Sequence, residues 1–207
     1  MFELVRAGGM LMLPIILFSI VAMAIIVERF WSLKRDKIIP PQLVRDIVGW
    51  AQKNELGQDK INSVRDGSPL GRVLVAGLKN SNQTREVMKE SIQDTGRHVT
   101  HELQRFLNTL GTIAAVSPLL GLLGTVLGMI KVFSVITDIG VGNPGELAGG
   151  ISQALITTAA GIAVAIPSLM FYRYFKGKVD QLVVEMEQES IKLVEVVYGK
   201  NKNTGKD

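Results

Sequence analysis

The stretch GISQALITTAAGIAVAIP, residues 150–167, decides the fold, because it is uncharged yet carries four hydrogen-bonding side chains. It lies in a run without a charged residue from Leu147 to Tyr172, and two similar runs are Ala7–Val27 and Phe106–Ile130. Each is about as long as the roughly 20 residues that cross a bilayer core. The sequence therefore predicts an all-α integral membrane protein with three transmembrane helices.

Composition agrees with this class of protein. The 207 residues are 47% hydrophobic, and the mean hydropathy is +0.26, which is high for a soluble domain. The net charge of +4 does not indicate nucleic-acid binding, because the basic residues gather beside the apolar runs with few aromatic residues among them. Without cysteine, disulfides and thiolate metal sites are excluded.

The first run has a second interpretation as a secretory signal, since Ala22-Met23-Ala24 resembles a cleavage site. The apolar stretch continues to Val27 without a polar region before that site, and four cations follow at once. The first run is therefore better interpreted as a transmembrane helix with a cytoplasmic flank.

Lys and Arg beside the runs predict the orientation, because cytoplasmic flanks are enriched in these residues. The turn Thr137–Gly149 has no cation, whereas basic residues flank the opposite ends: Arg29, Lys34, Arg35, Lys37, Arg97, Arg105, Arg173, Lys176 and Lys178. We expect an external N-terminus and a cytoplasmic C-terminus.

The expected organisation has seven parts. These are an external segment with the first span (1–29), a cytoplasmic helical domain with the start of a long helix (30–105), the second span (106–137), a short external turn (138–146), the third span (147–175), a cytoplasmic C-terminal helix (176–198) and a disordered tail (199–207).

The cytoplasmic parts show helical signals. A helix resumes at Gln42 after two prolines, another starts at Ser68-Pro69 with a hydroxyl cap, and a charged helix starts at Thr84. This last helix enters the second span without an interruption, and the third span continues in the same way. We expect the second and third spans to extend into a long cytoplasmic helical stalk, whose apolar seam is core packing.

Small residues form one face on each of the last two spans, and such faces allow close helix approach in membranes. The helix-packing residues are Gly121, Gly124, Gly128, Gly150, Ala154 and Gly161.

Thr125 and Thr158 lie at similar distances from the turn near Gly142, so a hairpin brings the two hydroxyls to similar depth. They could line a polar path, or each could bond back to its own helix. The three runs contain no carboxylate or histidine to carry a proton, so an ion path would need a titrating group from another polypeptide.

Catalytic motifs of soluble enzymes are absent, so we expect no enzymatic activity and no cofactor. His98 and His101 stand one helical turn apart, but a zinc site needs three or four ligands. They are better explained as a solvated helix face, and we expect no metal.

The layout, with the motifs SPLLGLLGTVLGMIKVF (117–133) and GNPGELAGGISQALITTAAGIAVAIPSLMFYRYF (142–175), resembles the ExbB/TolQ/MotA proton-channel family, on its ExbB/TolQ branch. The resemblance covers essentially the whole chain and is strongest from Arg85 to Glu187. It implies a homopentamer in the bacterial inner membrane, among phospholipid, whose pore encloses the helices of two copies of an ExbD- or TolR-like partner. Proton flow would then energise a TonB- or TolA-like protein.

By the same resemblance, the pore threonines of the family match Thr125 and Thr158, which would face the membrane aspartate of the partner. Gln153 and Thr157 are further candidates for the proton pathway. Many members have GIAEAL where this chain has GISQAL, so Gln153 replaces an acid. Since an amide cannot titrate, the partner's aspartate becomes the sole candidate relay.

Three functions remain open. The first is an ExbB-like motor subunit that energises outer-membrane transport, with a TolQ-like subunit for envelope integrity and cell division as its alternative. The others are a structural scaffold, in which the threonines only pack, and a self-contained transporter. The last is disfavoured because the chain has three spans, no inverted repeat and no charge recognised within a span.

Overall fold

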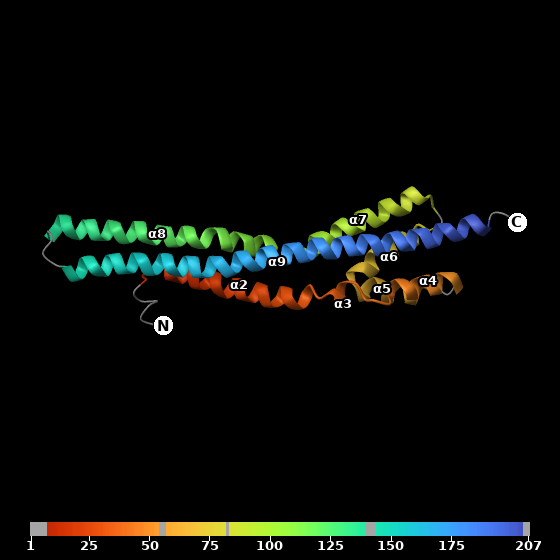
Figure 1. The fold of residues 1–207 in the computed structure, drawn as a ribbon, viewed down its shortest axis with the longest axis horizontal. Helices are drawn as coiled ribbons and strands as arrows, with labels where there is room; N and C mark the ends of the chain where they lie inside the picture. Colours follow the sequence, from red (N-terminus) through yellow and green to blue (C-terminus); the bar gives the residue numbers. More distant parts are fainter. Residues whose placement is uncertain (1–7, 54–56, 82, 140–143, 205–207) are drawn as a thin grey trace. The chain divides into compact units, whose positions relative to one another are not determined.

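The structure is a computed structural model that describes residues 8–53, 57–81, 83–139 and 144–204. Within these residues it is helical and has no strand, as predicted (Figure 1). Its helices are α2 (Met12–Ser32), α3 (Arg35–Ile38), α4 (Leu43–Lys53), α5 (Gln58–Gly67), α6 (Pro69–Lys79), α7 (Arg85–Leu103), α8 (Leu107–Ile139) and α9 (Pro144–Thr204).

Three of these helices are long and apolar enough to cross a membrane. The candidate spans are Met12–Ser32, Leu107–Thr137 and Leu147–Val197. They confirm the three predicted transmembrane helices, and α9 confirms that the third continues as one long helix.

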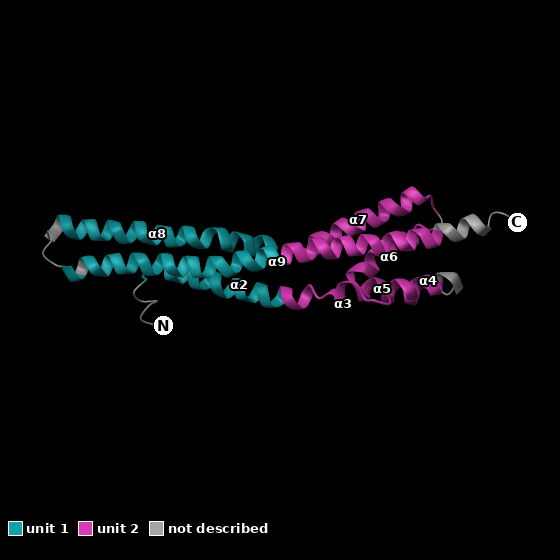
Figure 2. Cartoon of the chain, in the orientation of Figure 1, with its two compact units in different colours: residues 1–28, 106–174 teal, residues 29–105, 175–207 magenta. Residues whose placement is uncertain are grey.

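The chain divides into two compact units (Figure 2). Unit 1 comprises Met1–Glu28 and Phe106–Tyr174, and unit 2 comprises Arg29–Arg105 and Phe175–Asp207. Unit 1 therefore contains most of α2, all of α8 and the first part of α9. Unit 2 contains the helices α3 to α7 and the second part of α9.

In unit 1, α8 and α9 lie side by side along their lengths (Figure 2). Near one end, a Cβ built at Gly111 of α8 would lie 3.2 Å from the ring of Tyr172 of α9. Large apolar side chains nevertheless remain exposed on α8, as expected for a surface covered by lipid or by other subunits; they are Leu119, Leu122, Leu123, Val126, Leu127, Met129, Ile130 and Phe133.

In unit 2, the two predicted helix starts are found. The Ser68 hydroxyl accepts a hydrogen bond from the Gly71 amide at 3.0 Å, and the Thr84 hydroxyl accepts one from the Val87 amide at 3.4 Å. Both side chains satisfy an amide that the first turn of a helix leaves unpaired. Helix α5 was not predicted, because its sequence QDKINSVRDG is too polar to show a clear apolar period.

The expected single helix from Thr84 through the second span is two helices in the structure. Helix α7 ends at Leu103, residues 104–106 form a turn, and α8 begins at Leu107. Phe106 has φ +63°, in the left-handed region that interrupts a right-handed helix. Neither glycine nor proline marks this break, so the sequence pattern gave no signal for it.

At the C-terminal end, α9 continues to Thr204. It therefore runs through most of the segment 199–207 that was expected to be a disordered tail. Residues 205–207, and residues 140–143 of the expected external turn, lie outside the described residues.

A buried arginine links two helix ends in unit 2. Arg29, 4% exposed, donates a hydrogen bond from its guanidinium group to the backbone carbonyl of Leu103 at 3.1 Å. Leu103 is the last residue of α7, where carbonyl groups lack helical partners and positive charge is favourable. Arg29 is thus a structural cap as well as a predicted cytoplasmic flank.

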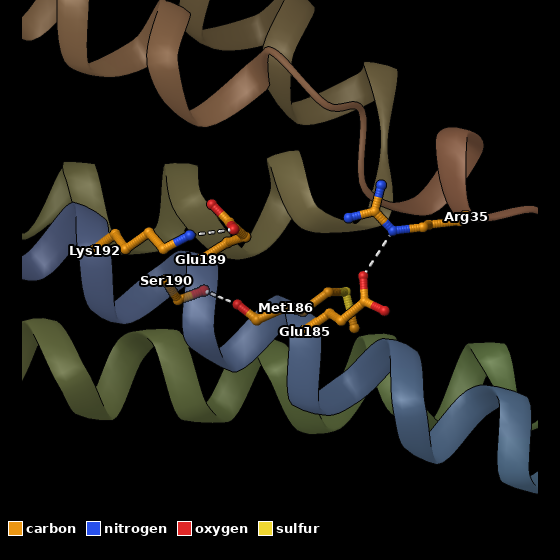
Figure 3. A network of polar contacts seen from close by, with 6 residues as sticks. All are labelled: Arg35, Glu185, Met186, Glu189, Ser190 and Lys192. Atoms are coloured by element: carbon orange, nitrogen blue, oxygen red, sulfur yellow. Dashed lines mark hydrogen bonds and ion pairs between the residues drawn. The ribbon is translucent and has the colours of Figure 1, made fainter.

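Surface ion pairs join other parts of unit 2 (Figure 3). The Arg35 guanidinium donates to the Glu185 carboxylate of α9 at 2.8 Å, and Lys192 pairs with Glu189 on the same helix at 2.6 Å. Such exposed pairs contribute little each, so the buried side chains of this unit provide most of its stability. The largest of these are Phe175, Ile38, Ile47, Leu70, Leu74, Met88, Leu182 and Leu193.

We expect Arg29→Met to weaken the C-terminal end of α7. The substitution leaves the Leu103 carbonyl without the donor, and a buried unsatisfied group costs about 1–3 kcal/mol. Amide hydrogen exchange of the full chain in detergent micelles should become faster in the last turn of α7. Arg45→Met, at an exposed position of α4, is the matched control and should change exchange there little. Equal exchange in both variants would contradict the capping role.

The pair Arg72–Glu102 should add stability that depends on pH. Hydrogen bonding from Arg72 holds the pKa of Glu102 below its ordinary value of 4.5. The contribution is therefore fully present above that value and is lost as the pH falls through the lowered pKa. A double-mutant cycle with Arg72→Gln and Glu102→Gln should give a coupling free energy of about 0.2–1 kcal/mol at neutral pH, because the pair is exposed. Coupling that persists undiminished in strong acid would refute this assignment.

Candidate functional site

The small-residue faces of α8 and α9 meet in unit 1 at backbone contact. A Cβ built at Gly161 would lie 2.5 Å from the Ser117 carbonyl oxygen and 3.2 Å from the Gly121 Cα atom. One built at Gly128 would lie 2.8 Å from the Ala154 Cβ atom. Side chains at these positions would force the two helices apart. The other predicted packing glycines, Gly124 and Gly150, face Thr157 and Val132 in the same way.

Thr158 forms a hydrogen bond across this interface. Its hydroxyl donates to the Gly121 carbonyl oxygen of α8 at 2.8 Å, and the side chain is half-buried. Hydrogen bonds between membrane helices contribute about 0.6 kcal/mol on average. Thr158 therefore bonds across the hairpin, rather than back to its own helix.

Thr125 behaves differently. Its hydroxyl donates to the Leu122 carbonyl oxygen of its own helix at 2.6 Å. Thr158 packs opposite Gly121, one helical turn from Thr125, so the two threonines lie within about 6 Å along the helix axes. The two threonines therefore lie at approximately the similar depth that was expected. That both residues contact a pore stays a prediction.

Thr157 packs against Gly124 of α8 and also reaches the segment before α2. It is 1% exposed, and its hydroxyl lies 3.0 Å from the Gly8 carbonyl oxygen and 2.7 Å from the Gln153 carbonyl oxygen. A hydroxyl has one proton to donate, so both partners share it. The residue thus ties α9 to the segment that precedes α2.

Gln153 faces the same segment. Gly9 has φ +72°, and a side chain there would collide with the Gln153 amide nitrogen. Both the backbone angle and the close approach therefore require glycine at this position. Gln153 is half-buried and lines a cavity of about 210 Å³, together with Gly8, Thr157 and Lys131.

Lys131 is the residue that the sequence reasoning missed. The uncharged run ends at Ile130, but both the expected second span (106–137) and the candidate span Leu107–Thr137 include this lysine. The expectation of no charge within a span is therefore corrected. An ionisable residue inside a membrane span is costly and is by default a functional candidate, which is the signal that could have identified it.

Ser117 is a second feature that the pattern did not reveal. Its hydroxyl is the only buried side-chain polar atom of the described residues that lacks a hydrogen-bond partner. It precedes Pro118, which has no amide proton and therefore interrupts the hydrogen bonding of α8. Of these two hydroxyl groups, that of Thr158 therefore has a hydrogen-bond partner, whereas that of Ser117 has none among the described residues.

These features define a helical membrane protein built around a tightly packed hairpin, with polar groups at the packed interface. Residues 65–188 match the MotA/TolQ/ExbB proton channel family. The chain belongs to this family, on its ExbB branch, and the family is one of channels and not of enzymes.

Individual relatives agree with the family match. An ExbB-like biopolymer transport protein of Synechocystis sp. is 37% identical over 169 residues, which cover 80% of this chain and 66% of the relative. A second ExbB-like protein of the same organism is 32% identical over 93% of this chain and 92% of the relative. The Tol-Pal system protein TolQ of Haemophilus influenzae is 27% identical over 81% of this chain and 78% of that protein.

We expect Gly161→Ala to destabilise unit 1. The added methyl group would press on the Ser117 carbonyl, and overpacking typically costs about 1–3 kcal/mol. Gly149→Ala is the matched control, because the same helix has open space at Gly149. Thermal unfolding in micelles should show a lower midpoint for Gly161→Ala only. Equal midpoints would show that α8 and α9 can separate without cost.

Proposed function

We propose that this chain is the ExbB-like channel subunit of a motor in the bacterial inner membrane. In this proposal it forms a homopentamer around two copies of an ExbD-like single-span partner that carries a membrane aspartate. Proton flow through the pore then energises a TonB-like protein and, through it, transport across the outer membrane. Its N-terminus is periplasmic and its C-terminus cytoplasmic.

One observation carries the proposal. The hairpin of the matched family region, from Leu107 to Thr137 and from Leu147 to Tyr172, contains no Asp, Glu or His. A proton crossing the low-dielectric core needs a group that can bind and release it. Lys131, near one end of α8, is the one charged residue of this hairpin. In this proposal, the relay of a channel whose hairpin has no carboxylate or histidine therefore comes from another polypeptide.

The exposed apolar face of α8 and the half-buried Thr125 support this arrangement. Side chains such as Leu122 and Val126 flank Thr125 and are about half-exposed in the single chain. A partner helix laid on this face would cover them and bring its acid beside the Thr125 hydroxyl. Thr158, bound to Gly121, would hold α8 and α9 in the geometry that presents this face.

A TolQ-like role is the second candidate, favoured by the match to the Tol-Pal system protein. In that case the partner is TolR-like, and the energised protein is TolA-like and maintains the envelope. The second ExbB-like protein of Synechocystis shows both higher identity and greater coverage than TolQ. Complementation of strains lacking either system distinguishes the two roles.

Proton flux tests the proposal. The chain alone in liposomes should not dissipate a pH gradient, whereas the chain reconstituted with its single-span partner should. Thr158→Val should lower the flux of the complex roughly threefold, since a hydrogen bond between membrane helices contributes about 0.6 kcal/mol on average.

The matched control is Thr112→Val, whose hydroxyl bonds only to the Asn108 carbonyl of its own helix. It should leave the flux unchanged. Strong flux from the lone chain would disprove the external relay. Normal flux in a stably folded Thr158→Val complex would favour a scaffold in which the threonines only pack.

A further inference from the structure

The cavity beside Gln153 has one cationic residue and, among the described residues, no acidic residue in its lining. It lies within unit 1, where the segment before α2 meets α8 and α9. Lys131, which is exposed in the single chain, and Gln153 both line it, and neither side chain has a hydrogen-bond or ion-pair partner in the part of unit 1 that the structure describes. The cavity therefore offers a cation and N–H donors to an anion.

An uncompensated ammonium group is unfavourable in or near the hydrocarbon core. The nearby Thr157 hydroxyl is uncharged and donates its proton to backbone carbonyls, so it cannot neutralise the ammonium group. A glutamate in place of Gln153 would pair with Lys131 and neutralise the cavity. Glutamine instead keeps the full positive charge and adds donors, which suits the binding of an external anion.

The depth of Lys131 indicates where this anion comes from. Lys131 follows Leu107, the first residue of α8, by about 36 Å along the helix axis, while the hydrocarbon core is about 30 Å thick. If α8 enters the core near Leu107, Lys131 reaches the opposite headgroup region, where the phosphate groups of one leaflet lie. This leaflet is the one nearest the α8–α9 turn.

The surroundings of the cavity fit a lipid better than a protein helix. A helix is about 10 Å wide, so it cannot enter a cavity of about 210 Å³, whereas a phosphate group can. Large apolar side chains beside the opening remain exposed, namely Met10 at 87% and Leu127 at 50%. They form a surface against which acyl chains can lie.

We propose that this cavity binds the phosphate group of a phospholipid, with Lys131 as counter-ion and Gln153 as hydrogen-bond donor. The lipid belongs to the leaflet nearest the α8–α9 turn. Gly8, Gly124 and Gly128 also line the cavity. The site does not depend on the proton relay and is tested without it.

Native mass spectrometry of the full chain, purified in detergent and titrated with phosphatidylglycerol, tests the proposal. Lys131→Gln should weaken phosphatidylglycerol binding roughly fivefold, the worth of one basic residue at a membrane surface. Gln153→Glu should weaken it similarly, because the new acid pairs with Lys131. Lys131→Arg should retain binding, and the matched control Lys89→Gln, at an exposed position of α7 in unit 2, should have no effect.

Other ligands that could occupy the cavity predict different results in this experiment. Inorganic phosphate should not displace the lipid at comparable concentration; if it binds as tightly, the site serves a soluble anion and the lipid assignment fails. If Lys131→Gln leaves lipid binding intact but abolishes co-purification of a single-span partner, the cavity holds the partner's acid instead. Circular dichroism of each variant separates loss of binding from loss of fold, and equal lipid binding by all folded variants overturns the proposal.

Discussion

The contact between the backbones of α8 and α9 is the constraint on which unit 1 depends. Because Gly121 and Gly161 have no side chains, the Thr158 hydroxyl can reach the Gly121 carbonyl at 2.8 Å. In lipid, where apolar burial gives little drive for helix association, such close packing and hydrogen bonding take its place. The same approach fixes which polar groups of α9 face α8 and which face the segment before α2.

This constraint separates the four polar side chains of residues 150–167. Thr158 donates to α8, Thr157 lies between Gly124 of α8 and Gly8, Gln153 lies against Gly9, and Ser152 is exposed in the single chain. Neighbouring positions on a helix point about 100° apart. Residues that a linear motif groups together therefore serve different surfaces, and only some of them are able to face a pore.

Much of the fold follows from the sequence, because uncharged runs and hydroxyl caps act locally. The spans, the starts of α6 and α7 and the glycine faces were all predictable from such patterns. The turn at Phe106 was not, since an aromatic residue with positive φ leaves no pattern of its own. Nor was the cavity, because Lys131 and Gln153 meet the segment before α2 only through tertiary packing.

Arg29 combines an expected role in insertion with an observed role in the folded protein. Its charge belongs to the basic flank that is expected to orient the first span. After folding, its guanidinium group is buried and holds the end of α7. A lysine there would keep the insertion signal but lose the planar, multi-donor geometry. Membrane topology and the stability of the following domain are thus separable at this position, and a variant with the correct orientation can still be poorly folded.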